Sequence, residues 1–159
     1  MTFSQHTSYF VQPNEDIRWA TLTFLSPGEE PVSITGLCGS AVAPPEFQRE
    51  GYTFCGWDSE VPETMPEADM TFTALWAETA VVTADGVRVD MTNRAPCTVV
   101  AAGYDEAGRM VCVGLEEADT GGICFVSGAA FAESARVSVF FLNQNRAPSY
   151  PAEQAVNGA

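Results

Sequence analysis

Short runs of alternating apolar and polar residues, separated by glycine and proline turns, recur along most of this 159-residue chain. The runs ATLTFLS at residues 20–26 and MTFTALW at residues 70–76 are clear examples. Because successive side chains of a strand point to opposite faces of a sheet, this period of two predicts strands with one buried face. Many such short runs with turn signals between them are typical of small β domains. The sequence therefore predicts a mainly β fold.

The first half of the chain predicts one compact set of strands. These are expected at residues 19–25, 31–34, 51–57 and 70–76, with Pro27-Gly28 turning the first pair into a hairpin. Ala43-Pro44-Pro45 excludes a regular helix or central strand, and leaves room for one helical turn at residues 46–49. The acidic segment 58–69, which contains two prolines, predicts a solvated loop.

The second half predicts strands at the short spacing of a sandwich. They are expected at residues 81–83, 87–91, 98–104, 109–115, 123–126 and 136–142, with a locally helical segment at 128–134. Four parts follow from this reading of the chain. Residues 1–18, with an edge strand at 8–11, form a leader or the end of a preceding module; residues 19–78 form a first β module; residues 79–148 form a small antiparallel β-sandwich; and residues 149–159 form a flexible tail.

Three segments in order within the first module carry a family resemblance. They are GSAVAPP at residues 39–45, GYTFCGW at 51–57 and the closing MTFTALW at 70–76. In this order they resemble the internalin B-type repeat, or Listeria-Bacteroides repeat, of bacterial surface proteins. The resemblance implies a compact β-grasp-like fold without catalytic residues, in which the core is formed by Tyr52, Phe54, Trp57 and Trp76. The first hairpin, TFLSPGEEP, departs from the family pattern, which usually has an aspartate and paired glycines there.

The second half carries a looser resemblance. AAGYDEAGRMVCVGL at residues 101–115 and RVSVFFLNQNRAP at residues 136–148 are similar to the small β-sandwich segments that end many surface proteins of gut Firmicutes. This resemblance implies an immunoglobulin-like or fibronectin-like spacer without an active site. Both resemblances imply an extracellular protein, secreted or attached to the cell surface. Its expected partners are other domains of the same protein, or a host or neighbouring protein.

The charge of the chain excludes several classes of function. Its net charge is −14, and all seven basic residues are arginines that stand singly in the sequence. Nucleic acids and anionic membranes both attract clustered basic residues, so we expect neither partner. No window approaches the length of an apolar membrane span, and MTFSQHTSYF has no export signal. We interpret the chain as a piece of a longer exported protein, and a cytoplasmic protein is the competing interpretation.

Candidate sites for chemistry are few. The only histidine, His6, is remote in sequence from every cysteine, which argues against a hydrolytic triad. Five cysteines without a CxxC pair predict buried free thiols or one disulfide, and no zinc site. Asp58, Glu60 and Asp69 are weak candidates for calcium ligands, because they supply hard oxygens within one segment. We expect no cofactor and no enzyme activity.

Two functions remain after these exclusions. The favoured one is a non-catalytic spacer or protein-interaction segment of a bacterial secreted or cell-surface protein. The alternative is a carbohydrate-binding accessory module that stacks a sugar on tryptophan. Because the family pattern assigns Trp57 and Trp76 to the core, only Trp19 is left as a candidate for ligand binding.

Overall fold

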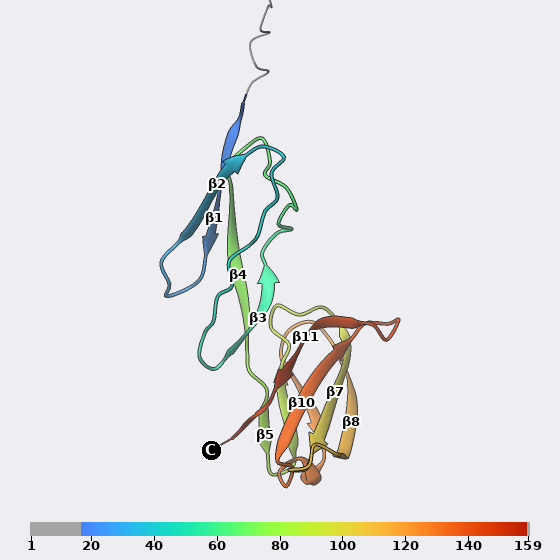
Figure 1. Cartoon of the computed structure of the whole chain (residues 1–159). Coiled ribbons are helices and arrows are strands. Elements are labelled where there is room, and N and C mark those ends of the chain that lie inside the picture. Colours follow the sequence, from blue (N-terminus) through green and yellow to red (C-terminus); the bar gives the residue numbers. More distant parts are fainter. Residues whose placement is uncertain (1–16, 159) are drawn as a thin grey trace, which may run out of the picture.

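The structure of the chain, a computed structural model, describes residues 17–158 (Figure 1). Within those residues it contains twelve strands and one short 3-10 helix, and the strands form three four-stranded sheets. The mainly β fold predicted from the alternating pattern is confirmed. The strand expected at residues 8–11 lies outside the described residues.

The first module, residues 19–78, is a single mixed sheet. Its strands are β1 (Trp19–Leu25), β2 (Val32–Leu37), β3 (Tyr52–Trp57) and β4 (Met70–Glu78), and they lie in the order β2-β1-β4-β3. The hairpin of β1 and β2 is antiparallel, whereas β1 and β4 run parallel. Parallel neighbours need a long crossover, and residues 26–69 supply it. Residues 46–49 are not helical; there Phe47 packs edge-on against Trp57, with ring centroids 5.9 Å apart.

The core of this module forms where β1 and β4 lie side by side. Leu22 and Phe24 are buried and alternate with half-buried threonines. The parallel register places Phe24 beside Phe72, and their rings stack with centroids 5.3 Å apart. Trp57 adds an edge-on contact with Phe24 at 4.9 Å. Because burial of each large apolar side chain contributes roughly 1.5–3 kcal/mol, this cluster is a main source of the module's stability.

The second module, residues 79–157, is a sandwich of two sheets. One sheet has the order β11-β10-β7-β8 and the other β12-β5-β6-β9. Inward-facing valines such as Val87, Val89, Val99 and Val139 fill the core between them. The bounds of its elements are β5 (Val81–Thr83), β6 (Gly86–Asp90), β7 (Cys97–Tyr104), β8 (Met110–Ala118), β9 (Ile123–Ser127), the 3-10 helix η1 (Ala129–Phe131), β10 (Arg136–Leu142), β11 (Pro148–Gln154) and β12 (Val156–Asn157).

The flexible tail predicted at residues 149–159 is wrong for the part that the structure describes. Strand β11 pairs antiparallel with β10, and β12 pairs parallel with β5. The segment PSYPAEQ has two prolines and little alternation, so its sequence does not indicate a strand. Proline is tolerated at the edge of a sheet, where its missing N–H faces away from the ladder. Strand β11 is such an edge.

Candidate functional site

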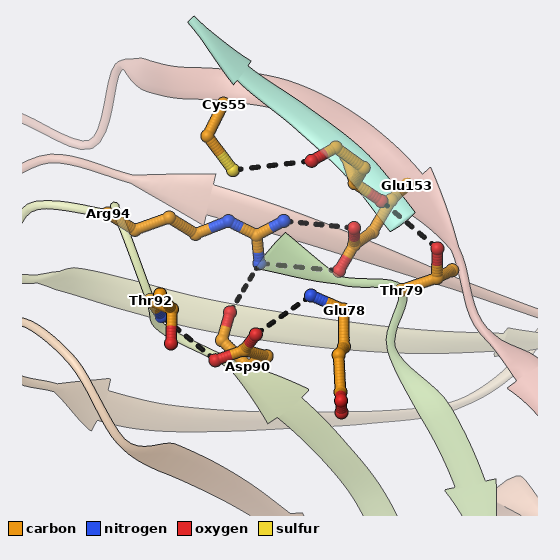
Figure 2. Close-up of polar contacts among 8 residues, drawn as sticks. Cys55, Glu78, Thr79, Asp90, Thr92, Arg94 and Glu153 are labelled. Atoms are coloured by element: carbon orange, nitrogen blue, oxygen red, sulfur yellow. Dashed lines mark hydrogen bonds and ion pairs between the residues drawn. The ribbon is translucent and has the colours of Figure 1, made fainter. Parts of the chain in front are cut away.

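The two modules meet at a joint that has almost no linker. Strand β4 ends at Glu78 and β5 begins at Val81, so only Thr79 and Ala80 lie between the last strand of one module and the first strand of the next. Figure 2 shows the polar side chains that gather beside this connection. We define the joint by the residues that make its contacts, namely Cys55, Trp76, Glu78, Asp90, Asn93, Arg94 and Glu153.

Arg94 is the centre of the joint. It lies in the loop between β6 and β7, and only 2% of its surface is exposed. Its two terminal nitrogens donate to the Glu153 carboxylate of β11, at 3.4 and 3.0 Å, and one of them also donates to the Asp90 carbonyl at 2.9 Å. Its guanidinium lies over the Phe141 ring, 4.1 Å from the centroid. A buried charge needs such partners because desolvation is costly.

The charge of Arg94 persists in this environment. Burial by itself lowers the pKa of Arg94, but the charge and hydrogen bonds of Glu153 outweigh that effect and raise the pKa above its ordinary value. The guanidinium of Arg94 is therefore a fixed positive charge of the folded protein.

Hydrogen bonds between backbone groups of the first module and side chains of the second connect the modules directly. The backbone N–H of Glu78, at the end of β4, donates to the Asp90 carboxylate of β6 at 2.8 Å. The side-chain amide Nδ2 of Asn93 donates to the backbone carbonyl of Trp76 at 2.8 Å. Asn93 has a φ of 60°, a left-handed conformation that asparagine adopts more readily than most residues. These bonds fix the entry of the chain into the sandwich.

Asp90 remains a carboxylate in this position. Burial raises the pKa of Asp90, but the backbone N–H groups of Thr92 and Glu78 donate to its carboxylate and bring the pKa below the ordinary value. Its acceptor capacity is therefore available throughout the neutral range.

The thiol of Cys55, on β3 of the first module, lies beside Arg94 (Figure 2). Burial raises the pKa of Cys55, and the neighbouring Arg94 offsets only part of this effect. Reactive cysteines have a lowered pKa because the thiolate is the nucleophile. With a protonated thiol and a fixed cation, the joint supplies no activated nucleophile. Its arrangement is suited to holding two domains together.

The predicted aromatic core residues occupy different environments. Trp76 is buried, and its ring contacts Phe54 edge-on at a centroid distance of 5.5 Å. Phe54 and Trp57 are half-buried and contact each other at 5.3 Å. Tyr52 is half-buried as well, and its ring lies under the Arg49 guanidinium, which is 3.8 Å from the ring centroid. The β3 ladder places Tyr52 opposite Glu78 near the end of β4.

Trp19 and the proposed calcium ligands lie elsewhere on the first module. Trp19 is 62% exposed and pairs across the hairpin with Leu37, which is also exposed. The Asp58 carboxylate accepts the backbone N–H of Thr73 at 3.0 Å, which lowers the pKa of Asp58. The Asp69 carboxylate accepts the N–H of Thr21 at 2.7 Å, while Glu60 is exposed. In residues 17–158 no group of three or more acidic, cysteine or histidine side chains is placed to hold a metal ion.

The five cysteines are free thiols in the structure. Cys97 and Cys124 are buried in the sandwich core, and burial raises the pKa of both.

Two hollows on the sandwich have volumes of 330 and 410 Å³. Three acidic residues line the first, whereas the second has no charged lining residue. No helix of the described part of the chain is long and apolar enough to cross a membrane.

Sequence reasoning missed the joint. Arg94 and Glu153 are 59 positions apart, and neither belongs to a local motif. The only local signal is the turn-forming Thr92-Asn93 pair before Arg94, and it does not indicate a buried charge. Comparisons with family models, with curated proteins and with solved structures found no match to this chain.

Proposed function

We propose that this chain is a non-catalytic spacer or protein-interaction segment of a bacterial secreted or cell-surface protein. The observation that supports a spacer is the two-residue connection between β4 and β5, reinforced by the joint. Domains joined by flexible linkers move independently by default. Here the hydrogen bonds to Asp90 and from Asn93 cross the connection. A chain built in this way holds its two modules at a fixed separation and orientation.

The chemistry of the joint also favours a mechanical role. Its charged groups already have partners within the protein. Arg94 pairs with Glu153, and the Asp90 carboxylate accepts two backbone N–H groups. None of these residues lines either of the two hollows on the sandwich. The partners that fit this proposal are other domains of the same protein, or a host or neighbouring protein. An extracellular location is part of the proposal and is tested by fractionating cells that express the natural gene.

Rigidity of the joint is testable in solution. We expect NMR relaxation to give the two modules one rotational correlation time, and X-ray scattering to fit a single elongated shape. Inserting a Gly-Ser-Gly-Ser segment between Thr79 and Ala80 should give each module its own, shorter correlation time. The same insertion in the exposed turn between Pro27 and Gly28 is the control and should leave the coupling intact. Independent tumbling of the unmodified modules would contradict the spacer proposal.

Carbohydrate binding is the second candidate function, and the exposure of Trp19 beside Leu37 favours it. Exposed aromatic rings can stack on sugars, but one tryptophan makes a small platform. We expect a glycan array to show no saturable binding. Saturable binding would replace the spacer proposal with this one if Trp19→Ala abolishes it and Leu37→Ala does not. The circular dichroism spectrum must show that the fold is intact.

A further inference from the structure

Strand β8 exposes an unusual amount of apolar surface. Eleven large hydrophobic residues are exposed within the described residues, and four of them are on this one strand: Met110, Val111, Val113 and Leu115. Leu115 is 62% exposed and Val113 is 51% exposed. Single exposed apolar residues are normal on protein surfaces, but a contiguous group marks an interaction site.

The apolar surface continues from β8 across the outer face of its sheet. Leu115 pairs with Val100 of β7, and Val100 pairs with Phe140 of β10, so the three form one row. Val100 and Phe140 are half-buried on this face, while their sequence neighbours face the core. The patch therefore extends inward from the edge strand.

The position of β8 leaves its backbone available as well. It is the last strand of the order β11-β10-β7-β8, so only its β7 side is paired within the sheet. Proteins commonly protect such edges with lysine, proline or inward charges. The stretch from Val111 to Leu115 has none of these, and the sequence contains no lysine. The ladder pairs Gly103 with Cys112 and Tyr104 with Met110, so Val111 forms a bulge at the start of the strand, and the register from Cys112 to Ala118 is regular.

The charges that flank the apolar stretch indicate which strand can pair with the β8 edge. Arg109 precedes the strand, while Glu116 and Glu117 follow the apolar stretch near its end. In an antiparallel pair of two β8 strands centred on Val113, the bulged Val111 comes opposite Leu115, and Arg109, which directly precedes β8, comes opposite Glu117, each twice. The 81% exposed Arg109 side chain pairs with Asp105 of its own chain at 2.8 Å. A guanidinium has five N–H donors, so it can bind a second carboxylate.

We propose that β8 is a self-association edge, at which a second copy of this chain adds its own β8 antiparallel about a two-fold axis at Val113. The pairing makes one continuous sheet from the two β11-β10-β7-β8 sheets. A register shifted toward the end of the strand brings Glu116 and Glu117 of both copies together, which their like charges oppose. The register centred on Val113 is therefore the one that the charges favour. The inference is independent of the spacer proposal, because it concerns assembly and not the joint.

A charge swap tests the register directly. We expect analytical ultracentrifugation of the full chain, in reducing agent, to show a concentration-dependent monomer–dimer equilibrium. Arg109→Glu and Glu117→Arg should each weaken self-association by about tenfold or more, because each places like charges opposite each other twice. An equimolar mixture of the two variants should dimerise at least as well as the unmodified chain, because every facing pair is then opposite in charge.

Substitution of the central residue supplies a second test. Val113→Lys places two ammonium groups together at the two-fold axis and should also weaken the dimer by about tenfold or more. Ile123→Lys on β9 is the matched control, because Ile123 is also an exposed residue of an edge strand. It should leave the dimer unchanged. A monomer at all concentrations overturns the proposal. So does a dimer that the mixture of Arg109→Glu and Glu117→Arg fails to restore, or one that Val113→Lys and Ile123→Lys weaken equally.

Discussion

Replacing Arg94 with methionine is expected to lower the free energy of unfolding of the second module by about 3–5 kcal/mol. The substitution leaves the Glu153 carboxylate, of which only 4% of the side chain is exposed, buried without its cation. The penalty arises from that uncompensated charge. Urea denaturation measures it, with hydrogen exchange of β7 and β10 identifying the module that unfolds.

Arg88→Met is the matched control for this prediction. Arg88 pairs with Glu78 at 3.1 Å, but 44% and 52% of the two side chains are exposed. Exposed ion pairs contribute only about 0–1 kcal/mol because water and salt screen them. A comparable loss from both substitutions would mean that the environment of Arg94 is not as desolvated as its burial indicates.

The double variant Arg94→Met/Glu153→Leu separates the effect of the ion pair on the free energy of unfolding from its effect on the coupling of the two modules. Replacing a buried ion pair with apolar residues of similar size is often neutral or stabilising, and the Nε of Arg94 has no hydrogen-bond partner within the described residues. We therefore expect the double variant to recover most of the lost stability. It also removes the guanidinium that interacts with Cys55 of the first module and donates to the Asp90 carbonyl, so a looser coupling of the modules should remain in the relaxation data.

Replacing Phe24 with alanine is expected to lower the free energy of unfolding of the first module by about 3–5 kcal/mol. Phe24 is fully buried and contacts both Phe72 and Trp57. All three tryptophans lie in the first module, so tryptophan fluorescence follows its unfolding without a contribution from tryptophans in the sandwich. The measurement is a urea denaturation curve recorded by that fluorescence.

Phe125→Ala is the control, because this phenylalanine is exposed on β9 and its loss should change stability by about 0.5 kcal/mol or less. Hydrogen exchange of the sandwich strands then tests whether the modules unfold separately. We expect Phe24→Ala to leave the exchange of β7 and β10 close to that of the unmodified chain. Equal destabilisation of both halves would contradict the division of the chain into two modules.

The alternating pattern predicted the strands themselves well, because alternation is a local property. Leu22 and Phe24 face one side of β1 in any sheet that buries that side. The glycine and proline turns likewise separated the sandwich strands at close to their observed positions. The same local evidence was wrong for the described part of the predicted tail, residues 149–158. Two prolines in a strand are acceptable only at an edge, and the strand order decides which strands are edges.

The sequence by itself determined the mainly β class and the faces of the strands that are apolar, since both depend on residues two positions apart. Only the tertiary structure decided that β1 runs parallel to β4, that Glu153 is buried and that Arg94 is its partner. The physical reason is distance along the chain. From the sequence, an arginine and a glutamate 59 positions apart would each be expected on the surface. Folding brings them together in a site without water, where each charge needs the other as its partner.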